Sequence, residues 1–282
     1  MDDKQTAETP QSAVQAAVVG GEEVRPRSTQ GQSLATIDKE RCIGSALSLG
    51  MQVAASKLAG FPFWHFDANS GCGWNNEVDV PGSPLVFWNL AEARMPNMRV
   101  RAFFSEIEKP SILQLQERLR FSERAAACSY LLPGDNAEGI EVFAQMVRDH
   151  DKPHFAVGSL IVDPNGYFYR SKQGIGAPVD QVIAFTAEFP RVDIILNLNT
   201  RQYRLQAAHK FPQLSVPEMF AVLNKKHWLV RLTHHGTNEF LLAVGRNMPT
   251  GEHKGLGMHA ISSPEGQHIL FRVEGSRQGA LL

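Results

Sequence analysis

Three residue types that follow one apolar stretch have the chemistry of a ligand-binding loop. Asp67 ends the apolar run 63–67, and Gly71 and Gly73 follow it with one residue between them. Glycine suits such a loop because a side chain would keep the backbone from turning sharply and from lying against a bound ligand. Asp67, Asn69, Gly71 and Gly73 are therefore our candidate residues for binding a nucleoside-containing cofactor.

The residues after Gly73 indicate which cofactor fits. A dinucleotide-binding loop has a third glycine that opens a helix at once, and the pyrophosphate binds at that helix N-terminus. Here a polar stretch follows Gly73 instead, and the next helix signal is Ser83-Pro84. A long loop that closes over S-adenosylmethionine fits this pattern better. Two glycines at this spacing also occur in ordinary strand-to-loop turns, and that alternative stays open.

Acidic residues follow the next two predicted strands. In nucleoside-binding sheets, an acid at the end of the second strand accepts hydrogen bonds from both ribose hydroxyls. Glu106 is our candidate for this contact, whereas Glu108 suits an acid at a helix N-terminus. Asp135 follows the third strand, where an adenine amine would be met. It is equally suited to a turn or a helix cap.

The candidate reaction centre follows the strand at 155–162, the clearest buried strand of the chain. An Asp-Pro turn at the carboxyl end of a central strand holds a carboxylate in the crevice where open sheets bind ligands. Asp163 is our candidate for orienting an amine toward a methyl sulfonium, and Tyr167 for stacking on a base. Pro164 and Asn165 complete the candidate catalytic turn. The alternative is an ordinary Pro-Asn-Gly turn with no catalytic role.

Hydrophobic periodicity predicts the elements that hold these loops. The predicted strands lie at about 63–67, 99–106, 125–132, 155–162 and 192–199. The predicted helices lie at about 43–58, 83–94, 110–119, 140–146, 179–189 and 216–224. A hairpin of 228–233 with 240–244 follows. The order predicts an α/β, Rossmann-like fold whose mostly parallel sheet ends in a C-terminal antiparallel hairpin.

The N-terminal region differs in composition from the rest of the chain. Residues 1–38 are rich in small and polar residues and contain no aromatic residue, so they bury little surface against the entropy of ordering. We predict a mobile tail over 1–38 and a single α/β domain over 39–282. No apolar run approaches the roughly 20 residues that span a bilayer, and the acidic start lacks the basic region of a signal peptide. We predict a cytoplasmic protein without membrane contact.

Charge and cysteine content exclude several classes. The formal net charge of -1 gives no global basic field, so any nucleic-acid contact requires a local patch. The three cysteines form no Cys-x-x-Cys pair, which argues against a disulfide framework and against structural zinc. We therefore predict no metal. The residues predicted to form a local basic rim are Lys225, Lys226, His227, Arg231, His234 and His235, with Arg170, Lys172 and the stacking ring of Trp228.

Such a rim suits single-stranded or flipped-out nucleic acid, because cations contact phosphates and aromatic rings stack on bases. A solvated helix end and hairpin is the alternative explanation of the same residues.

The chain also resembles a known family. Its order of five βα units and a hairpin is similar to class I methyltransferases that use S-adenosylmethionine, and more narrowly to the three-Cys-motif partner proteins. The motifs that carry the resemblance are Asp67-x-x-x-Gly71-x-Gly73, Gly82-Ser-Pro-Leu85, Phe104-Ser-Glu-Ile-Glu-Lys109 with Leu119, and Val162-Asp-Pro-Asn-Gly166. The resemblance covers about residues 43 to 266. It implies S-adenosylmethionine as cofactor and methyl transfer as the reaction class.

Two departures from the family's pattern define a second hypothesis. The family's Ala-Gly-Pro-Gly loop is replaced by the sequence that ends in Gly71-Cys72-Gly73. The aromatic residue that follows Asp-Pro in the family is replaced by Asn165. The leading hypothesis is a methyltransferase acting on an amine of a DNA or RNA substrate. The alternative is a catalytically silent methyltransferase-fold module that binds a partner protein.

Overall fold

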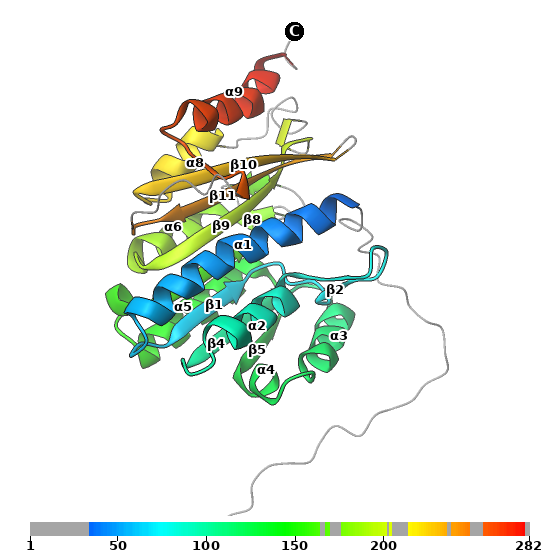
Figure 1. The fold of residues 1–282 in the computed structure, drawn as a ribbon, viewed down its shortest axis with the longest axis vertical. Coiled ribbons are helices and arrows are strands. Elements are labelled where there is room, and N and C mark those ends of the chain that lie inside the picture. Colours follow the sequence, from blue (N-terminus) through cyan, green and yellow to red (C-terminus); the bar gives the residue numbers. More distant parts are fainter. Residues whose placement is uncertain are drawn as a thin grey trace, which may run out of the picture.

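The computed structural model describes residues 34–163, 167–169, 176–201, 203–204, 214–235, 238–248 and 256–279. An eight-stranded sheet has helices on both faces (Figure 1). Its strands are β1 (Phe63–Asp67), β4 (Val100–Glu106), β5 (Ser129–Pro133), β6 (Val157–Val162), β9 (Val192–Asn199), β10 (His227–His235), β11 (Asn238–Arg246) and β12 (His259–Ala260). The helices are α1 (Leu34–Lys57), α2 (Ser83–Arg94), α3 (Lys109–Leu119), α4 (Glu123–Cys128), α5 (Asn136–His150), η1 (Pro153–Phe155), α6 (Val179–Glu188), α8 (Val216–Val222) and α9 (Pro264–Gly279).

Two small strand pairs stand apart from the sheet. They are β2 (Trp74–Asn75) with β3 (Val80–Pro81), and β7 (Tyr167–Tyr169) with β8 (Gly176–Pro178). The first pair follows the glycine loop, and the second follows the predicted catalytic turn. Both candidate loops therefore lead into a short strand pair before the next helix.

The strand order is β12-β10-β11-β9-β6-β1-β4-β5. β1 runs parallel to β4 and β6, while β11 runs antiparallel to both β9 and β10. This confirms the predicted Rossmann-like sheet with its C-terminal antiparallel hairpin. From β1 the chain continues to β4 and β5 on one side and then returns to β6 on the other. Ligands of open sheets bind beside such a reversal, at the carboxyl ends of the strands.

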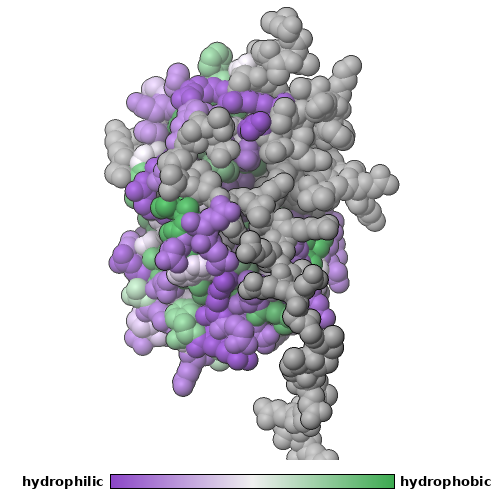
Figure 2. Space-filling view, turned by 90° about the vertical axis from the view of Figure 1, so that its right-hand side faces the viewer, coloured by the Kyte–Doolittle hydropathy of each residue, from purple (hydrophilic) through white to green (hydrophobic). Residues whose placement is uncertain are grey.

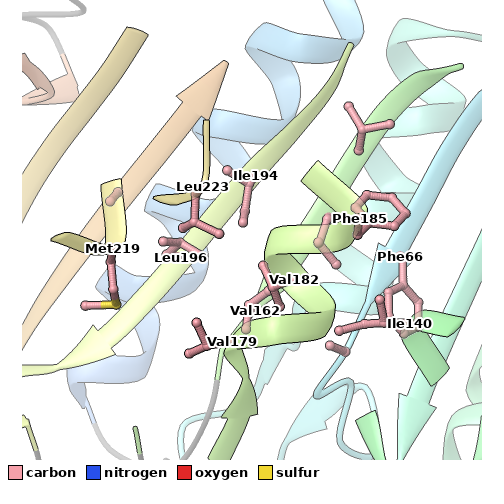
Figure 3. Close-up of a cluster of buried hydrophobic side chains, with 14 of the residues drawn as sticks. Phe66, Ile140, Val162, Val179, Val182, Phe185, Ile194, Leu196, Met219 and Leu223 are labelled. Carbon is pink, nitrogen blue, oxygen red and sulfur yellow. The ribbon is translucent and has the colours of Figure 1, made fainter. Parts of the chain in front are cut away.

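Apolar side chains fill both faces of the sheet because successive strand residues point to opposite faces. On one face, Phe66 of β1 stacks on Phe143 of α5, which in turn stacks on Phe185 of α6. Figure 3 shows Phe66 and Phe185 in this cluster. On the other face, Phe63 of the same strand lies in the cluster formed with α1, α2 and α3. Helix α1 crosses this second face diagonally (Figure 1) and contacts β6, β9, β10 and β11. Its first half lies at the carboxyl end of β6, where Lys39 meets Asp163, and its second half lies near the start of β9.

One predicted strand boundary is wrong, and α1 begins earlier than predicted. The segment 125–128, predicted as the start of the third strand, is the end of α4, and β5 begins at Ser129. Ser122 caps this helix by accepting the backbone N–H of Ala125 at 3.2 Å, and three consecutive alanines favour a helix. Residues 34–38, which we assigned to the tail, are helical because α1 begins at Leu34. Residues 1–33 lie outside the described residues, and the division into tail and domain stays a prediction.

Candidate active site

Asp67 fastens the loop that follows β1. Its Oδ1 accepts the backbone N–H of Asn69 at 3.1 Å, and its Oδ2 accepts the hydroxyl of Ser83, the first residue of α2, at 2.6 Å. Burial raises the pKa of Asp67 to about 6, although both hydrogen bonds oppose the shift. The carboxylate thus ties the loop to α2 and does not face open space.

The two predicted glycines have different structural roles. Gly71 has φ +58° and Gly73 has φ +76°, a backbone region that favours glycine. A Cβ on Gly73 would lie 2.7 Å from Cδ1 of Leu115 in α3, so this position has no room for a side chain. A Cβ on Gly71 would meet no atom within 4 Å. Gly73 therefore serves the packing of the loop, and the space beside Gly71 is open to a ligand.

Glu106 lies where the ribose-binding acid was predicted, at the end of β4 and beside the glycine loop. Its Oε2 accepts the N–H of Gly71 at 2.9 Å, and its Oε1 accepts the N–H of Glu108 at 2.9 Å. Each carboxylate oxygen has a second lone pair with which to accept another hydrogen bond. Two backbone N–H groups therefore orient the carboxylate of Glu106. Its contact with ribose stays a prediction.

Asp135 is the N-cap of α5. Its Oδ1 accepts the N–H of Ala137 at 2.6 Å, which is the capping role that we weighed against an adenine contact. The preceding Gly134 donates its N–H to the carbonyl of Glu106 at 3.0 Å. Asp135 is therefore exposed beside the end of β4, and its contact with adenine stays a prediction.

Asp163 is held between two elements at the end of β6. Its Oδ2 accepts a hydrogen bond from Lys39 Nζ at 2.7 Å, and its Oδ1 accepts one from Asn197 Nδ2 of β9 at 2.7 Å. The first turns of α1 thus cover the carboxyl ends of β6 and β9. Pro164 and Asn165 lie outside the described residues, as does the side chain of Tyr167, whose backbone belongs to β7.

Lys39 and Glu40 belong to this site, and sequence reasoning missed them. Lys39 Nζ lies 3.4 Å from Glu40 Oε1 as well as bonding Asp163. Burial raises the pKa of Glu40 to about 7, with Lys39 opposing the shift. Burial lowers the pKa of Lys39, but the carboxylates of Asp163 and Glu40 outweigh this effect and the net shift is upward. The spacing of the apolar residues could have indicated Glu40. It lies one helical turn before Ile43, so it falls on the face of α1 that packs against the sheet.

Three buried acceptor atoms near this cluster have no hydrogen-bond partner among the described residues. They are Glu40 Oε2, Asn69 Oδ1 and Asn197 Oδ1. The orientation of the Asn197 amide follows from chemistry, because an ionised Asp163 only accepts and must face the amide nitrogen. A buried acceptor left unpaired costs about 1–3 kcal/mol, so these atoms favour a ligand that donates hydrogen bonds. The ammonium group of a methionine moiety has this chemistry.

Two residues of the predicted basic rim, Lys225 and Trp228, are buried. Lys225 is buried at the start of β10, and its Nζ donates to the carbonyl of Val192 at 2.8 Å. Trp228 is also buried and stacks on Phe220 with ring centroids 4.2 Å apart, so it is not available to a base. These residues begin β10, at the edge opposite to the candidate site, because β10 runs in the same direction as β9. Lys226 is exposed, Arg231 donates from Nη1 to the carbonyl of Leu256 at 2.7 Å, and Lys172 and Arg170 lie outside the described residues.

A different basic group lies at the end of β10, on the side of the candidate site. The buried carboxylate of Glu239 lies 2.5 Å from Arg204 Nη2, 3.1 Å from Arg272 Nη2 and 2.5 Å from His234 Nε2. Thr200, directly after β9, donates its hydroxyl to the same carboxylate at 2.9 Å. Of the rim predicted from sequence, His234 belongs to this Glu239 cluster. Figure 2 shows this side of the molecule, where hydrophilic side chains predominate among the described residues.

Two classes of site are not found in the described part of the chain. No group of three or more His, Cys, Asp or Glu side chains is arranged there to hold a metal ion. No helix among these residues is both long enough and apolar enough to cross a bilayer.

The strand order, with β11 inserted antiparallel between β9 and β10, defines the Rossmann-like fold of class I methyltransferases. No protein-family model matches the sequence, and no curated protein matches it significantly. Protein LPL1258 of Legionella pneumophila is similar in structure, with a TM-score of 0.51 and 12% identity, over 77% of this chain and 88% of that one.

Two further solved structures are similar to this chain with lower TM-scores. The magnesium protoporphyrin IX methyltransferase of Synechocystis, solved with bound S-adenosylmethionine, has a TM-score of 0.42 and 11% identity over 75% of this chain and 81% of that one. The N-terminal domain of human METTL16 has a TM-score of 0.43 and 6% identity over 76% of this chain and 70% of that one. At these identities the likeness describes the fold. Membership of the three-Cys-motif partner family stays a prediction.

Proposed function

We propose that this chain is an S-adenosylmethionine-dependent methyltransferase that acts on an amine of a nucleic acid. The observation that carries the proposal is the carboxyl edge of the sheet around Gly71. There an open space adjoins a glycine whose N–H is held by Glu106. Buried unpaired acceptors of Glu40, Asn69 and Asn197 belong to the neighbouring cluster. This combination favours a ligand with ribose hydroxyls and an ammonium group.

The chain's own residues then have separate roles toward the cofactor. Glu106 accepts hydrogen bonds from the ribose hydroxyls, and Asp135 meets the adenine amine. The loop at 71–73 lies against the methionine end, where the unpaired acceptors suit its ammonium group. When bound, S-adenosylmethionine supplies an activated methyl group, so the protein contributes mainly orientation.

Asp163 orients the acceptor amine. Lys39 and Asn197 hold its two oxygens at 2.7 Å each, so the carboxylate has a fixed direction before any substrate binds. Each oxygen retains a lone pair for an N–H of the acceptor. A carboxylate that is already fixed favours catalysis, because an amine bound to it loses little further freedom in the transition state.

The Glu239 cluster supports a nucleic acid as the acceptor. Two arginines and one histidine lie around one carboxylate, and arginine presents donors that match phosphate oxygens. Asn197 bonds Asp163, and Thr200, three residues later, bonds Glu239. At about 3.3 Å per strand residue, these two points lie roughly 10 Å apart on the same edge. Phosphate contacts at this distance would position a base amine near Asp163.

One observation favours a second candidate, the catalytically silent binding module. Asp163 forms an ion pair with Lys39, and such a pair stabilises the fold without any reaction. In that case the site retains cofactor binding and the surface serves a partner protein, in line with the resemblance to three-Cys-motif partner proteins. Methyl transfer by the purified chain separates the two candidates.

The experiment measures transfer of a labelled methyl group from S-adenosylmethionine to total RNA and to DNA. The proposed enzyme labels one of them, and Asp163→Asn abolishes labelling while its affinity for S-adenosylhomocysteine is unchanged. Asp149→Asn, an exposed acid on α5, is the matched control and retains activity. Cofactor binding without labelling of any nucleic acid or cell protein would establish the silent module instead.

A second measurement addresses the nucleic acid itself. Binding to single-stranded RNA or DNA, followed by gel shift, is expected to fall steeply with added salt because each phosphate contact releases counterions. Arg272→Gln is expected to weaken this binding and to reduce the salt dependence by about one counterion. No binding to either polymer at low salt would redirect the search to protein or small-molecule acceptors.

A further inference from the structure

A cavity lies at the amino edge of the sheet, opposite to the candidate active site. Its volume is about 70 Å³, and it lies between the second half of α1 and the starts of β1, β6 and β9. Its polar lining comes from Lys57 of α1, Arg191 and Asp193 at the start of β9, and Arg246 at the end of β11. Of the described residues that line this cavity, three are cationic and one is acidic.

The charge at the base of this cavity is not balanced. Arg246, whose side chain is only 2% exposed, donates from Nη2 to Asp193 Oδ2 at 2.6 Å, and its Nε has no partner among the described residues. The buried Lys225 also acts on Asp193, because burial raises the pKa of this carboxyl while Arg246 and Lys225 both oppose the rise. Two buried cations thus share one carboxylate. Lys57 and Arg191 add exposed positive charge.

Burying a charge is costly unless an opposite charge or hydrogen bonds compensate it. The carbonyls around Lys225 provide hydrogen bonds but no negative charge. Gly50 lets helix α1 pack closely over the Asp193–Arg246 pair, because a side chain there would crowd the pair. A Cβ at this position would lie 3.2 Å from Asp193 Oδ2 and 3.9 Å from Arg246 Nη2. The excess of positive charge therefore adjoins the cavity, which Arg246, Lys57 and Arg191 all line.

We propose that this cavity binds a tetrahedral oxyanion, either inorganic phosphate or a terminal phosphate group, between Arg246, Lys57 and Arg191. The cavity volume of about 70 Å³ exceeds the volume of about 30 Å³ that one water occupies in the liquid. The cavity therefore has room for one small oxyanion and little more. Arginine presents a planar set of donors that matches phosphate oxygens. The site does not depend on the proposed methyltransferase function, since it lies at the opposite edge of the sheet.

The test is a calorimetric titration of the full chain with inorganic phosphate at constant ionic strength, and with chloride as the reference anion. Saturable phosphate binding at one site per chain is expected, without saturable chloride binding. Lys57→Met and Arg191→Met change exposed side chains, and each is expected to weaken phosphate binding at least about fivefold. Lys109→Met, an exposed lysine at the opposite edge, is the matched control and should bind as the unchanged chain does.

Glycerol 2-phosphate distinguishes the source of the phosphate. If it binds as tightly as inorganic phosphate, the site accepts a terminal phosphate group, and if only inorganic phosphate binds, the site accepts the free anion. Arg246→Met should remove binding altogether, and thermal melting checks that this variant is folded. The proposal is overturned if phosphate gives no saturable heat, or if the Lys57, Arg191 and Lys109 variants all lose the same small amount of affinity.

Discussion

At the carboxyl edge of the sheet, α1 places Lys39 among the three acids Glu40, Asp67 and Asp163, whereas at the amino edge the single acid Asp193 faces buried and exposed cations. The two edges therefore carry opposite excesses of charge beneath one helix. The carboxyl edge also has unpaired acceptors, which suit ligands that donate hydrogen bonds. The amino edge has a cationic cavity, which suits anions.

This difference shows that strand direction alone does not determine the charge at each edge. β9 carries Asn197 near one end and Asp193 near the other, and α1 spans both. Each edge obtains its charge from side chains that α1 and the flanking strands bring to these ends. The two edges can be tested separately, because each contains an ion pair that a single substitution removes.

The largest expected effect is at the amino edge. Arg246→Met leaves Asp193 without its partner at 2.6 Å and should lower the free energy of unfolding by about 3–5 kcal/mol, the usual result of removing one member of a buried ion pair. Urea unfolding measures the change. Adding Asp193→Asn to this variant should recover most of the loss. A loss below about 1 kcal/mol in Arg246→Met would mean that the pair is effectively solvated.

At the carboxyl edge we expect a smaller loss. Lys39→Met removes the cation that faces Asp163 and Glu40, but both members of the Lys39–Asp163 pair are partly exposed, at 16% and 15%. We expect a loss of about 2–3 kcal/mol at pH 8 in urea unfolding, with the loss decreasing in acid as Glu40 gains its proton. A loss that is equal at pH 5 and pH 8 would show that Lys39 does not interact with Glu40.

Burial of Glu40 at the carboxyl edge also predicts a pH dependence of stability. The pKa of Glu40 is raised from 4.5 to about 7 in the folded chain, so the folded state binds the extra proton between these values. Its contribution is fully present below about 4.5 and is lost as the pH rises through about 7. Relative to Glu40→Gln, the unchanged chain should therefore lose about 2 kcal/mol of stability between pH 5 and pH 8. Parallel pH profiles of the two proteins would contradict the assignment.

Glu106→Ala tests the cofactor part of the comparison. It removes the acceptor of the Gly71 N–H and the proposed ribose contact, so S-adenosylhomocysteine should bind about tenfold more weakly, near 1.4 kcal/mol. Calorimetric titration measures this loss. Glu108→Ala, the neighbouring acid at the start of α3, is the control and should bind normally. If the Glu108 variant is the weaker binder, the ribose contact belongs to Glu108.

The smallest effect separates the two roles of Asp135. Asp135→Ser keeps an N-cap for α5, whereas Asp135→Ala loses it and should cost about 1 kcal/mol of stability. If Asp135 also meets adenine, both variants should bind S-adenosylhomocysteine several-fold more weakly. Normal affinity in the serine variant would leave Asp135 with the capping role alone.

The fold was predictable from the sequence where hydrophobic periodicity agrees with the residues that begin or end helices and strands. β1 and α2 have the predicted bounds, because an apolar run ends at Asp67 and Ser83-Pro84 opens a helix. The segment 125–132 was ambiguous, since Ala125 to Cys128 fit a helix as well as a strand. The N-cap that Ser122 provides favours the helix.

The site was predictable only in part, because two of its features depend on contacts between distant residues. The position of Glu106 beside Gly71 follows from adjacent parallel strands, and sequence reasoning found it. The ion pair of Lys39 with Asp163 joins residues 124 positions apart, and no local pattern indicates it. The prediction that Trp228 stacks on bases failed because its ring is buried against Phe220 of α8, a contact that the local sequence does not indicate.

The most direct test of the account is a calorimetric titration of the full chain with S-adenosylhomocysteine, in the absence and presence of saturating phosphate. We predict one binding site per chain with micromolar affinity, unchanged by phosphate because the two ligands occupy opposite edges of the sheet. The absence of binding heat up to high micromolar S-adenosylhomocysteine, in a chain that melts cooperatively, would contradict the assignment of the carboxyl edge as a cofactor site.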